Sequence, residues 1–515
     1  MKIREVLDKL TISFEIVVTT LCFFGCGSSS PGTPSTTVTQ TQNPLVAQYQ
    51  VHQFGAANVW VEFGTDQTYG RQTSPIAGGG SSAFKTETVY VAGMKPSTTY
   101  HMRAHIDYTF GSSWIDQDHI FTTGPLPSGN KLGLKVTRPN PSLGIKQSGV
   151  ELLDIVATGT HNLQGLVTDL DGNVIWYYDF GAATPSSWPF PIKQLANGDM
   201  LMMVNATSTD NLIEVDLSGQ TVRSISLNDL NAKLQQQGLP QILYMHHDVL
   251  VLPNGHWVVL GQLNRTYDNL QGFTGPTQVT GDMLIDLDAN FNITWTWLSF
   301  DHLDVNRHLF GLPDWTHSNA VVYSPNDGNI LLSMRNQSWI LKIDYNNGTG
   351  SGDILWRLGE DGDIALVGGD PSLWFYAQHY PNILSADGTT TTLAIFDDGN
   401  QRVLNDQGTT CVGFYPNCYS RGTIFQVDDA TRVATLQWQD LPGYFTFWGG
   451  SIGVMDNGDV EFDASAPVGL GVLESRVLEV TQTDSPEVVW QLEITGGNAY
   501  RAFRIPSLYS GVTWK

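Results

Sequence analysis

The sequence is poor in positive charge and in cysteine, and it contains no long hydrophobic run. Its 515 residues include 26 Lys and Arg against 50 Asp and Glu, which gives a net charge of −24. This excess of carboxylates repels a phosphate backbone and excludes nucleic acid as an expected partner. The glycine-rich loop G-x-x-x-x-G-K-[S/T], which cradles nucleotide phosphates, is also absent.

The composition predicts an all-β protein with two folded units. Hydrophobic residues make up 41% of the chain and charged residues only 15%, so bulk disorder is excluded. The 52 glycines and 24 prolines, with frequent Asn-Gly and Asp-Gly pairs, divide the chain into many short strands and leave little room for long helices. A length of 515 residues suits a small module followed by one large repeat fold.

The N-terminus is typical of an export signal. Residues 16–24 form a nine-residue apolar run, which is too short to span a bilayer as a helix because that requires about 20 residues. Lys2, Arg4 and Lys9 precede the run, as in a secretion signal. We therefore expect an exported, periplasmic protein.

The end of this signal, Phe23-Phe24-Gly25-Cys26, resembles a bacterial lipobox, in which Cys26 would receive lipid after cleavage. Residues 1–26 are then a signal peptide, and lipidated Cys26 is the only expected contact with the membrane. The competing interpretation is an ordinary signal peptide with an incidental cysteine. Residues 27–44 are mostly Gly, Ser, Thr, Pro, Gln and Asn, which predicts a flexible linker.

Two cysteines, Cys411 and Cys418, remain in the folded part. Six residues including Gly and Pro separate them, and in an oxidising compartment this spacing predicts a disulfide that closes a loop. Two free thiols are the alternative. No metal site is expected, because no second Cys pair or closely spaced His pair accompanies them. The turn at residues 397–400 could hold Ca²⁺, but a plain solvated turn is favoured.

Residues 45–127 alternate apolar and polar side chains in the manner of a small β-sandwich. Residues 93–104, which include Tyr100, and residues 121–124 resemble the closing strands of fibronectin type III domains, where the tyrosine packs at a strand corner. The histidines of this module are expected to be structural. They are His52, His101, His105 and His119.

Residues 128–515 carry a repeat that predicts a six-bladed β-propeller. Two turn elements alternate along the chain, which implies four strands per unit, and six units fill the available length. Each unit has apolar faces that only its neighbours can cover, so the repeated tryptophans are expected in the core. The first element occurs at residues 171–176, 216–220, 288–295, 346–356, 428–438 and 484–490, and the second at residues 195–199, 252–256, 324–328, 385–388 and 455–459.

Histidines mark the expected lining of the propeller channel. Three His motifs precede a strand and a turn at corresponding places of different units, so their side chains should converge on one axis. An Arg, Arg335, lies in an otherwise apolar predicted strand, residues 331–337, and needs an anionic partner. With an Asn, these groups form a cationic, donor-rich cluster suited to a sulfate or phosphate oxyanion. The motifs are His246-His247-Asp248, His317-Ser318-Asn319 and Gln378-His379-Tyr380.

These segments, together with residues 333–337 and 396–400, resemble the successive signatures of bacterial arylsulfate sulfotransferases in order and in spacing. The resemblance covers about residues 150–510. It implies an exported six-bladed propeller that moves sulfuryl groups between phenols without a nucleotide donor or any other cofactor. The partners would be a small-molecule aryl sulfate and a phenolic acceptor, and a homodimer is a candidate assembly.

The resemblance also implies the roles of the site residues in a ping-pong reaction. His379 would be the nucleophile that becomes a transient sulfohistidine. His317 and Asn319, with Arg335, would hold the sulfuryl oxygens and move the phenolic proton. One of His246 and His247 would complete the cluster, and His247 is favoured because alternation along a strand turns only one of two neighbours toward the channel.

Aromatic side chains near these motifs could stack against the phenol ring, although in a chain with 15 tryptophans a core position is the more common outcome. The candidates are Trp374, Phe375, Tyr376, Phe445, Phe447 and Trp448.

Three other interpretations remain at this stage. A ligand-binding propeller without activity would leave the cluster unexplained. A quinone-dependent propeller dehydrogenase would usually have more blades and a vicinal Cys pair. A hydrolytic sulfatase would carry Cys-x-Pro-x-Arg or Ser-x-Pro-x-Arg, which the sequence lacks.

Overall fold

The computed structural model describes residues 32–78, 84–143, 147–157, 163, 165–179, 188–205, 211–405, 407–412, 417–468 and 474–514. The predicted signal peptide and Cys26 lie outside these residues. Within them the protein is all-β, as predicted. Helical segments are few and short, namely α1 (Leu227–Gln236), α2 (Ser299–His302) and the 3₁₀ turns η1 (Arg335–Gln337), η2 (Asn346–Gly348) and η3 (Pro371–Leu373). No helix in the described ranges is long and apolar enough to cross a membrane.

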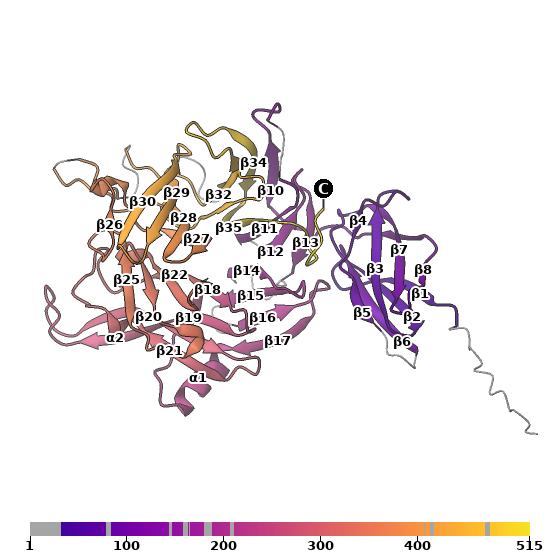
Figure 1. Ribbon diagram of the computed structural model, residues 1–515, viewed down its shortest axis with the longest axis horizontal. Helices are drawn as coiled ribbons and strands as arrows, with labels where there is room; N and C mark the ends of the chain where they lie inside the picture. The colour runs from indigo at the N-terminus through magenta and orange to yellow at the C-terminus, as the bar shows by residue number, and fades with distance from the viewer. Residues whose placement is uncertain are drawn as a thin grey trace, which may run out of the picture.

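The N-terminal unit consists of two antiparallel sheets that share an apolar core (Figure 1). The larger sheet is built on the pair β3 and β7, and alternate residues of these strands face the core. One sheet contains β1 (Ser35–Gln40), β2 (Ala47–Phe54) and β6 (Phe84–Val91). The other contains β3 (Ala57–Gly64), β4 (Arg71–Gln72), β5 (Ile76–Gly78), β7 (Thr99–Tyr108), β8 (Ser113–Ile115) and β9 (His119–Thr122).

Strand β1 lies inside residues 27–44, the stretch expected to be a flexible linker, and pairs in full register with β2. The segment Ser-Thr-Thr-Val-Thr-Gln is rich in β-branched residues, and the sheet edge of β2 offers it a hydrogen-bonding partner. Residues 35–40 therefore belong to the N-terminal unit, although the composition of residues 27–44 predicted a flexible linker.

The rest of the described chain forms six sheets of four or five strands. In chain order, the first sheet contains β11 (Val150–Ala157), β12 (Gly165–Thr168), β13 (Val174–Tyr178) and β35 (Gly497–Ile505), and the second contains β14 (Trp188–Gln194), β15 (Met200–Asn205), β16 (Asn211–Val215) and β17 (Thr221–Ser226). The third contains β18 (Tyr244–Val251), β19 (Trp257–Tyr267), β20 (Thr277–Leu287) and β21 (Ile293–Leu298), and the fourth contains β22 (Ser318–Ser324), β23 (Asn329–Met334), β24 (Trp339–Ile343) and β25 (Ile354–Leu358). The fifth contains β26 (Ala365–Leu366), β27 (His379–Asp387), β28 (Thr390–Asp397), β29 (Arg421–Asp428) and β30 (Val433–Asp440), and the sixth contains β31 (Ser451–Val454), β32 (Val460–Ala464), β33 (Glu474–Val480), β34 (Val488–Thr495) and β10 (Gly133–Thr137).

These sheets form a closed ring around an axis (Figure 1). The strand at the inner edge of each sheet contacts its counterparts in the neighbouring sheets, in the order β14, β18, β22, β27, β31 and β35, and β14 packs on β11 beside β35. Two strand pairings join the beginning and the end of the ring. β35 pairs with β11 in one sheet, and β10 pairs with β34 in the adjacent one.

Tryptophans on the outer strands join neighbouring sheets. The indole N–H of Trp176 donates to the carbonyl of Leu217 in the next sheet, that of Trp297 to Gly352, and that of Trp490 to Leu170, each at 2.9 Å. All three rings are buried. A buried Trp needs a partner for its N–H, and here a turn of the adjacent sheet supplies it. Several of the repeated tryptophans are therefore structural, as the repeat predicted.

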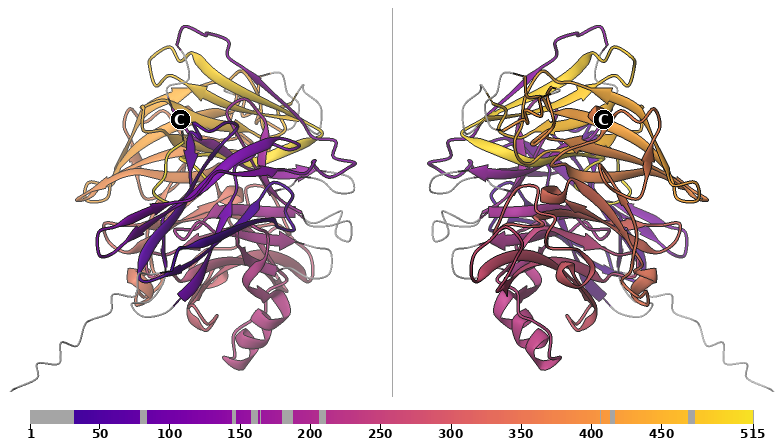
Figure 2. Two further views of the ribbon diagram at one scale, coloured as in Figure 1. Left: turned by 90° about the vertical axis from the view of Figure 1, so that its right-hand side faces the viewer. Right: turned by 90° about the vertical axis from the view of Figure 1, so that its left-hand side faces the viewer.

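The segment after β35 fixes the N-terminal unit to the ring. The Tyr509 hydroxyl donates to Tyr90 O at 2.8 Å and accepts from the Ala92 N–H at 2.7 Å, while the Trp514 indole donates to Gln72 O at 3.1 Å. Figure 2 shows the two units from both sides. One apolar cluster runs from the sandwich into the first two sheets of the ring, so the two units share a continuous core.

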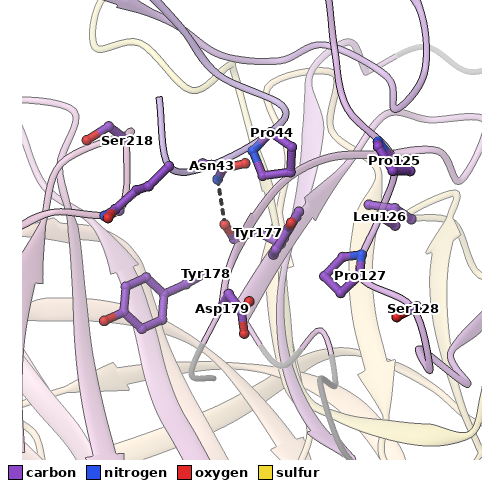
Figure 3. A pocket seen from close by; sticks show the side chains of 12 residues that line it. Asn43, Pro44, Pro125, Leu126, Pro127, Ser128, Tyr177, Tyr178, Asp179 and Ser218 are labelled. Atoms are coloured by element: carbon purple, nitrogen blue, oxygen red, sulfur yellow. Dashed lines mark hydrogen bonds between the residues drawn. The ribbon is translucent and has the colours of Figure 1, made fainter. Parts of the chain in front are cut away.

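A cavity of about 720 Å³ lies between the β1–β2 loop of the N-terminal unit, the segment that follows β9, and the ring (Figure 3). Asn43 donates to Tyr177 O at 2.8 Å beside it. None of the residues that line this cavity belongs to a histidine motif. Its walls are formed by residues 42–44, 125–128, 177–179 and 218–219.

Candidate active site

The inner strands carry β-bulges where the sequence motifs lie. Register shifts leave His246, His247 and Asp248 of β18 opposite a shorter stretch of β19, and they leave Asn319 of β22 as an extra residue. The same occurs after His379 in β27 and at Tyr500 in β35. A bulge bends the strand and turns its side chains in a new direction, and bulges are frequent beside active sites. The motifs thus come together through a shared backbone irregularity.

Left-handed backbone conformations accompany these bulges. His247, His317 and Tyr380 have φ values of 57°, 47° and 42°, and Ala377 has 52°. Residues with a side chain seldom adopt such angles, and outliers of this kind persist only where the surroundings hold them. Their clustering at one end of the inner strands marks this place as a functional-site candidate.

His247 lies among the other motifs, whereas His246 points toward its own sheet. The rings of His247 and His317 are 4.7 Å apart, and His247 also contacts the ring of Tyr500 at 5.9 Å. His246 Nε2 is 3.2 Å from Asp282, and the Nδ1 atoms of His246 and His247 are 2.7 Å apart. His246 therefore contacts His247 through Nδ1, while its Nε2 faces the carboxylate of Asp282.

His379 is 2% exposed, and each of its ring nitrogens has a close polar neighbour. Nδ1 lies 2.9 Å from Asp398 Oδ2, and Nε2 accepts the backbone N–H of Gly449 at 3.2 Å. An Nε2 that accepts a hydrogen bond carries no proton, and its lone pair is directed at the Gly449 N–H. Gly449 has a φ of 75°, and a Cβ there would lie 2.8 Å from Ser465, so only glycine fits.

Burial and neighbouring cations keep His379 neutral. Burial lowers the pKa of His379 well below its ordinary value, and the charges of Arg335, His317 and Arg501 lower it further. The pKa of His247 is lowered in the same way by burial and by His317, His246, His379 and Arg501. Burial has the opposite effect on Asp398 and raises the pKa of its carboxyl.

Arg335 follows β23 in the turn η1, not within a strand as the sequence suggested. Its backbone N–H donates to His317 O at 3.3 Å, which brings the two residues together. The guanidinium donates to Asn336 Oδ1 and to Phe447 O, each at 2.8 Å, and lies 5.1 Å from the Phe310 ring. Its Nε is buried without a hydrogen-bond partner among the described residues, so one donor remains for an anion.

His317 lies nearer to solvent, with a side chain that is 28% exposed, and its Nδ1 is 2.5 Å from Asp314 Oδ2. Asn319 is fully buried. Its amide donates to Gln378 O at 2.7 Å, directly before His379 in the chain. Asn319 thus fixes the backbone beside His379, a contact that differs from the direct hold on sulfuryl oxygens that we expected.

The aromatic candidates separate into two groups. Trp374, Phe375 and Tyr376 are buried in the core beneath the site, and Phe445 is also buried. Phe447 is 41% exposed beside Arg335, and Trp448 stacks on Tyr500 with ring centroids 6.2 Å apart.

Sequence reasoning missed Tyr500, Arg501, Phe310 and the Gly449 N–H. Tyr500 and Arg501 lie on β35, which has no histidine motif. The sequence offers little signal for this pair, because β35 also carries the polar residues Asn498 and Arg504.

The disulfide Cys411–Cys418 is present, as predicted. Cys411 exchanges backbone hydrogen bonds with Gln401 and Arg402 at 2.8 Å. Arg402 and Arg421 both pair with the buried Asp397, so this carboxylate neutralises guanidinium groups. Among the described residues, no group of His, Cys, Asp and Glu is arranged to hold a metal ion.

Comparison with known proteins identifies one family. The family model described as Arylsulfotransferase (ASST) matches residues 146–501, which include every histidine motif. A search of curated proteins finds no match. Among solved structures, a protein from Lactobacillus plantarum is 11% identical, with 67% of this chain and 82% of that chain covered and a TM-score of 0.35. A putative 6-phosphogluconolactonase from Bacteroides fragilis is 9% identical, with 88% and 98% covered and a TM-score of 0.35.

Proposed function

The chain belongs to the arylsulfotransferase (ASST) family, and from that premise we propose that it transfers a sulfuryl group from an aryl sulfate to a phenol through a sulfohistidine on His379. The contacts of His379 carry this proposal. A buried, neutral imidazole whose Nε2 bears a lone pair, next to the guanidinium of Arg335 and the imidazole of His317, is a nucleophile beside an anion site.

In the first step, the hydrogen bond from the Gly449 N–H to Nε2 of His379 is released, and the Nε2 lone pair attacks sulfur and forms an N–S bond. The bond from sulfur to the aryl oxygen breaks, and the phenolate leaves with the electron pair. A proton from His317 neutralises the leaving phenolate, and Asp314, 2.5 Å from Nδ1, orients that ring. Arg335 stabilises the charge on the sulfuryl oxygens and on the bridging oxygen.

In the second step, an acceptor phenol gives its proton to His317, and its oxygen attacks sulfur. The N–S bond breaks and the electron pair returns to Nε2, which restores neutral His379. Asp398, 2.9 Å from Nδ1, orients the ring in both steps. Asn319 helps to position His379, because its amide donates to the carbonyl of the preceding residue, Gln378.

The ring is interpreted as the six-bladed β-propeller expected from the repeats, with the six sheets as blades. The N-terminal unit is interpreted as fibronectin type III-like. One contact that supports this is the hydroxyl of Tyr100, which accepts the N–H of Lys95 at 2.9 Å in the manner of a tyrosine corner.

The aryl ring is assigned to the space between Phe447, Phe310 and Trp448, near Arg335. Phe447 exposes much of its ring there, and aromatic faces favour a stacked phenol. We also propose export to the periplasm with a lipid anchor on Cys26. The Cys411–Cys418 disulfide supports an oxidising compartment.

The test combines turnover with covalent labelling. The protein is mixed with a chromogenic aryl sulfate with and without added phenol, and both aryl alcohol and free sulfate are measured. We expect aryl alcohol release to require phenol, and mass spectrometry of protein treated with donor alone to find a sulfuryl group on the peptide containing His379. Phenol-independent sulfate release would indicate a hydrolase, and a label on another residue would reject His379 as the nucleophile.

A further inference from the structure

A guanidinium on the closing strand β35 lies buried at the ring axis and contacts three other inner strands. Arg501 is 0% exposed. Its Nη1 lies 3.3 Å from Asp248 of β18, and its Nη2 donates to the Asn319 carbonyl of β22. The guanidinium also lies 4.6 Å from the Tyr380 ring of β27 and 5.1 Å from that of Tyr500 on its own strand. Every one of these partners belongs to a bulge.

Asp248 extends the same network to a fifth inner strand. Its carboxylate lies 2.7 Å from Lys193 Nζ of β14 and accepts the N–H of Val321 in β22 at 2.9 Å. Both Asp248 and Arg501 are fully buried, and a buried charge needs such compensation. Burial opposes a charged Arg501, but Asp248 outweighs that effect and raises its pKa, so the guanidinium is always charged.

The bulges need this support because each of them interrupts the hydrogen bonds between strands. An inner strand that loses some of its backbone hydrogen bonds to the neighbouring strand is held less firmly by its own sheet. The site, however, requires imidazoles and a guanidinium from different strands to meet within a fraction of an ångström. A rigid group that links the bulges can supply that order.

We propose that Arg501 is a positioning residue for sulfuryl transfer, which holds the bulges of β18, β22 and β27 together and places a permanent positive charge beside His247 and His379. The proposal rests on the proposed function, because the bulges carry the residues assigned to the reaction. The planar guanidinium suits this task, since it can pair with a carboxylate, donate to a carbonyl and stack on aromatic rings at the same time, which an ammonium cannot do.

The charge of Arg501 adds a measurable signature. His379 faces Arg501 and Tyr500 from β35, Arg335 from η1, His317 before β22, Asp398 after β28 and the Gly449 N–H. His247 faces His246, His317, His379, Tyr500 and Arg501. Because a nearby cation disfavours a protonated imidazole, removal of the Arg501 charge should raise the pKa of both histidines.

The same strand supplies a matched control. Arg504 is also buried, and it pairs with Glu151, with Glu479 at 3.1 Å and with Glu461 at 3.6 Å, while stacking on Trp490 at 4.8 Å. It contacts none of the bulge residues named above in the described structure. Replacement of Arg504 thus tests the loss of a buried arginine on β35 without disturbing the proposed network.

The experiment compares Arg501→Lys, Arg501→Met and Arg504→Lys. We expect Arg501→Lys to lower kcat about 10- to 100-fold with KM changed less than about threefold, because the transition-state geometry suffers more than substrate binding. We expect Arg501→Met also to shift the acid limb of kcat upward by about half a pH unit to one unit. Arg504→Lys should lower the melting temperature but leave kcat within about twofold.

A second readout does not depend on turnover. The imidazole resonances of His379 and His247, assigned from His→Asn variants, are titrated by NMR in each protein, and Arg501→Met should raise both pKa values. Unchanged kcat and titration in Arg501→Lys and Arg501→Met would overturn the proposal, as would the same changes in Arg504→Lys. If Arg501→Met does not fold, Arg501→Lys decides through kcat. If the wild type transfers no sulfuryl group, the proposed function fails and the titration alone decides the role of Arg501.

Discussion

Histidines in the N-terminal unit and histidines at the ring axis have similar first partners but very different surroundings. In the N-terminal unit, His101 lies 2.7 Å from Asp118 and His105 lies 2.8 Å from Glu62. At the axis, His317 and His379 lie 2.5 and 2.9 Å from Asp314 and Asp398. A pair of His and carboxylate is therefore no sign of a site by itself.

The difference lies in what surrounds each pair. His105 stacks on Trp60 with ring centroids 3.9 Å apart on a half-buried strand face, which is a structural role. The axial imidazoles lie against one another and against Arg335 and Arg501, in a buried place where like charges are unfavourable. Arg335 places positive charge beside these neutral imidazoles, and the proposed aryl sulfate would supply an anion to balance it.

The sharpest test of this comparison is His379→Asn against His101→Asn. Loss of the axial imidazole removes the nucleophile, so transfer to phenol should fall by more than about 10³-fold. Loss of His101 removes only a contact at the surface of the N-terminal unit, so activity should stay within about twofold. Steady-state transfer from a chromogenic donor measures both. Comparable activities in the two variants would abolish the distinction between the regions.

A second test replaces one arginine in each region. Arg335→Leu removes a donor aimed at the sulfuryl group, and kcat should fall about 10²-fold, as for loss of an oxyanion donor. Arg103 pairs with Glu62 in the N-terminal unit and stacks on Tyr69, so Arg103→Leu should alter stability slightly and kcat by less than about twofold. Donor saturation curves separate kcat from KM. A large KM effect with normal kcat in Arg335→Leu would restrict that side chain to binding.

The smallest expected effect concerns the pH dependence of stability. Burial raises the pKa of Asp154, near the axis, to about 7. Its folded form binds a proton more tightly than the unfolded chain, so this group stabilises the fold at acid pH, and that contribution is lost as the pH rises through about 7. Asp118 is the reverse case. Burial favours a higher pKa for Asp118, but hydrogen bonds with His101, Gln67 and Tyr69 lower this pKa below its ordinary value. Asp118 therefore stabilises the fold at neutral pH, and this contribution to stability is lost only as the pH falls into the acid range.

Asp154→Asn should therefore become more stable relative to the wild type as the pH rises from 5 to 8, by up to about 1.4 kcal/mol per pH unit. Asp118→Asn should keep a constant difference over that range. Denaturant unfolding at several pH values measures the free energies. A pH-independent difference for Asp154→Asn would show that the carboxyl stays charged.

The sequence predicted the all-β class, the disulfide and the family from turn spacing, Cys spacing and His motifs. The motifs could be located because they lie in local patterns. The partners Gly449 and Arg501 could not, since they reach His379 from other sheets, and no periodicity along the chain encodes which strand closes the ring. Phe447 and Trp374 illustrate the same limit. Both are aromatic residues beside motifs, and only the packing separates an exposed ring from a core one.

The same strand that ends the ring also finishes the site. β35 begins at residue 497 and carries Tyr500 and Arg501, while its pairing with β11 joins the last sheet to the first. During synthesis, the histidines are made long before this strand emerges. A growing chain can thus hold every imidazole of the proposed centre before the ring is closed, because β35 follows all of them in the sequence.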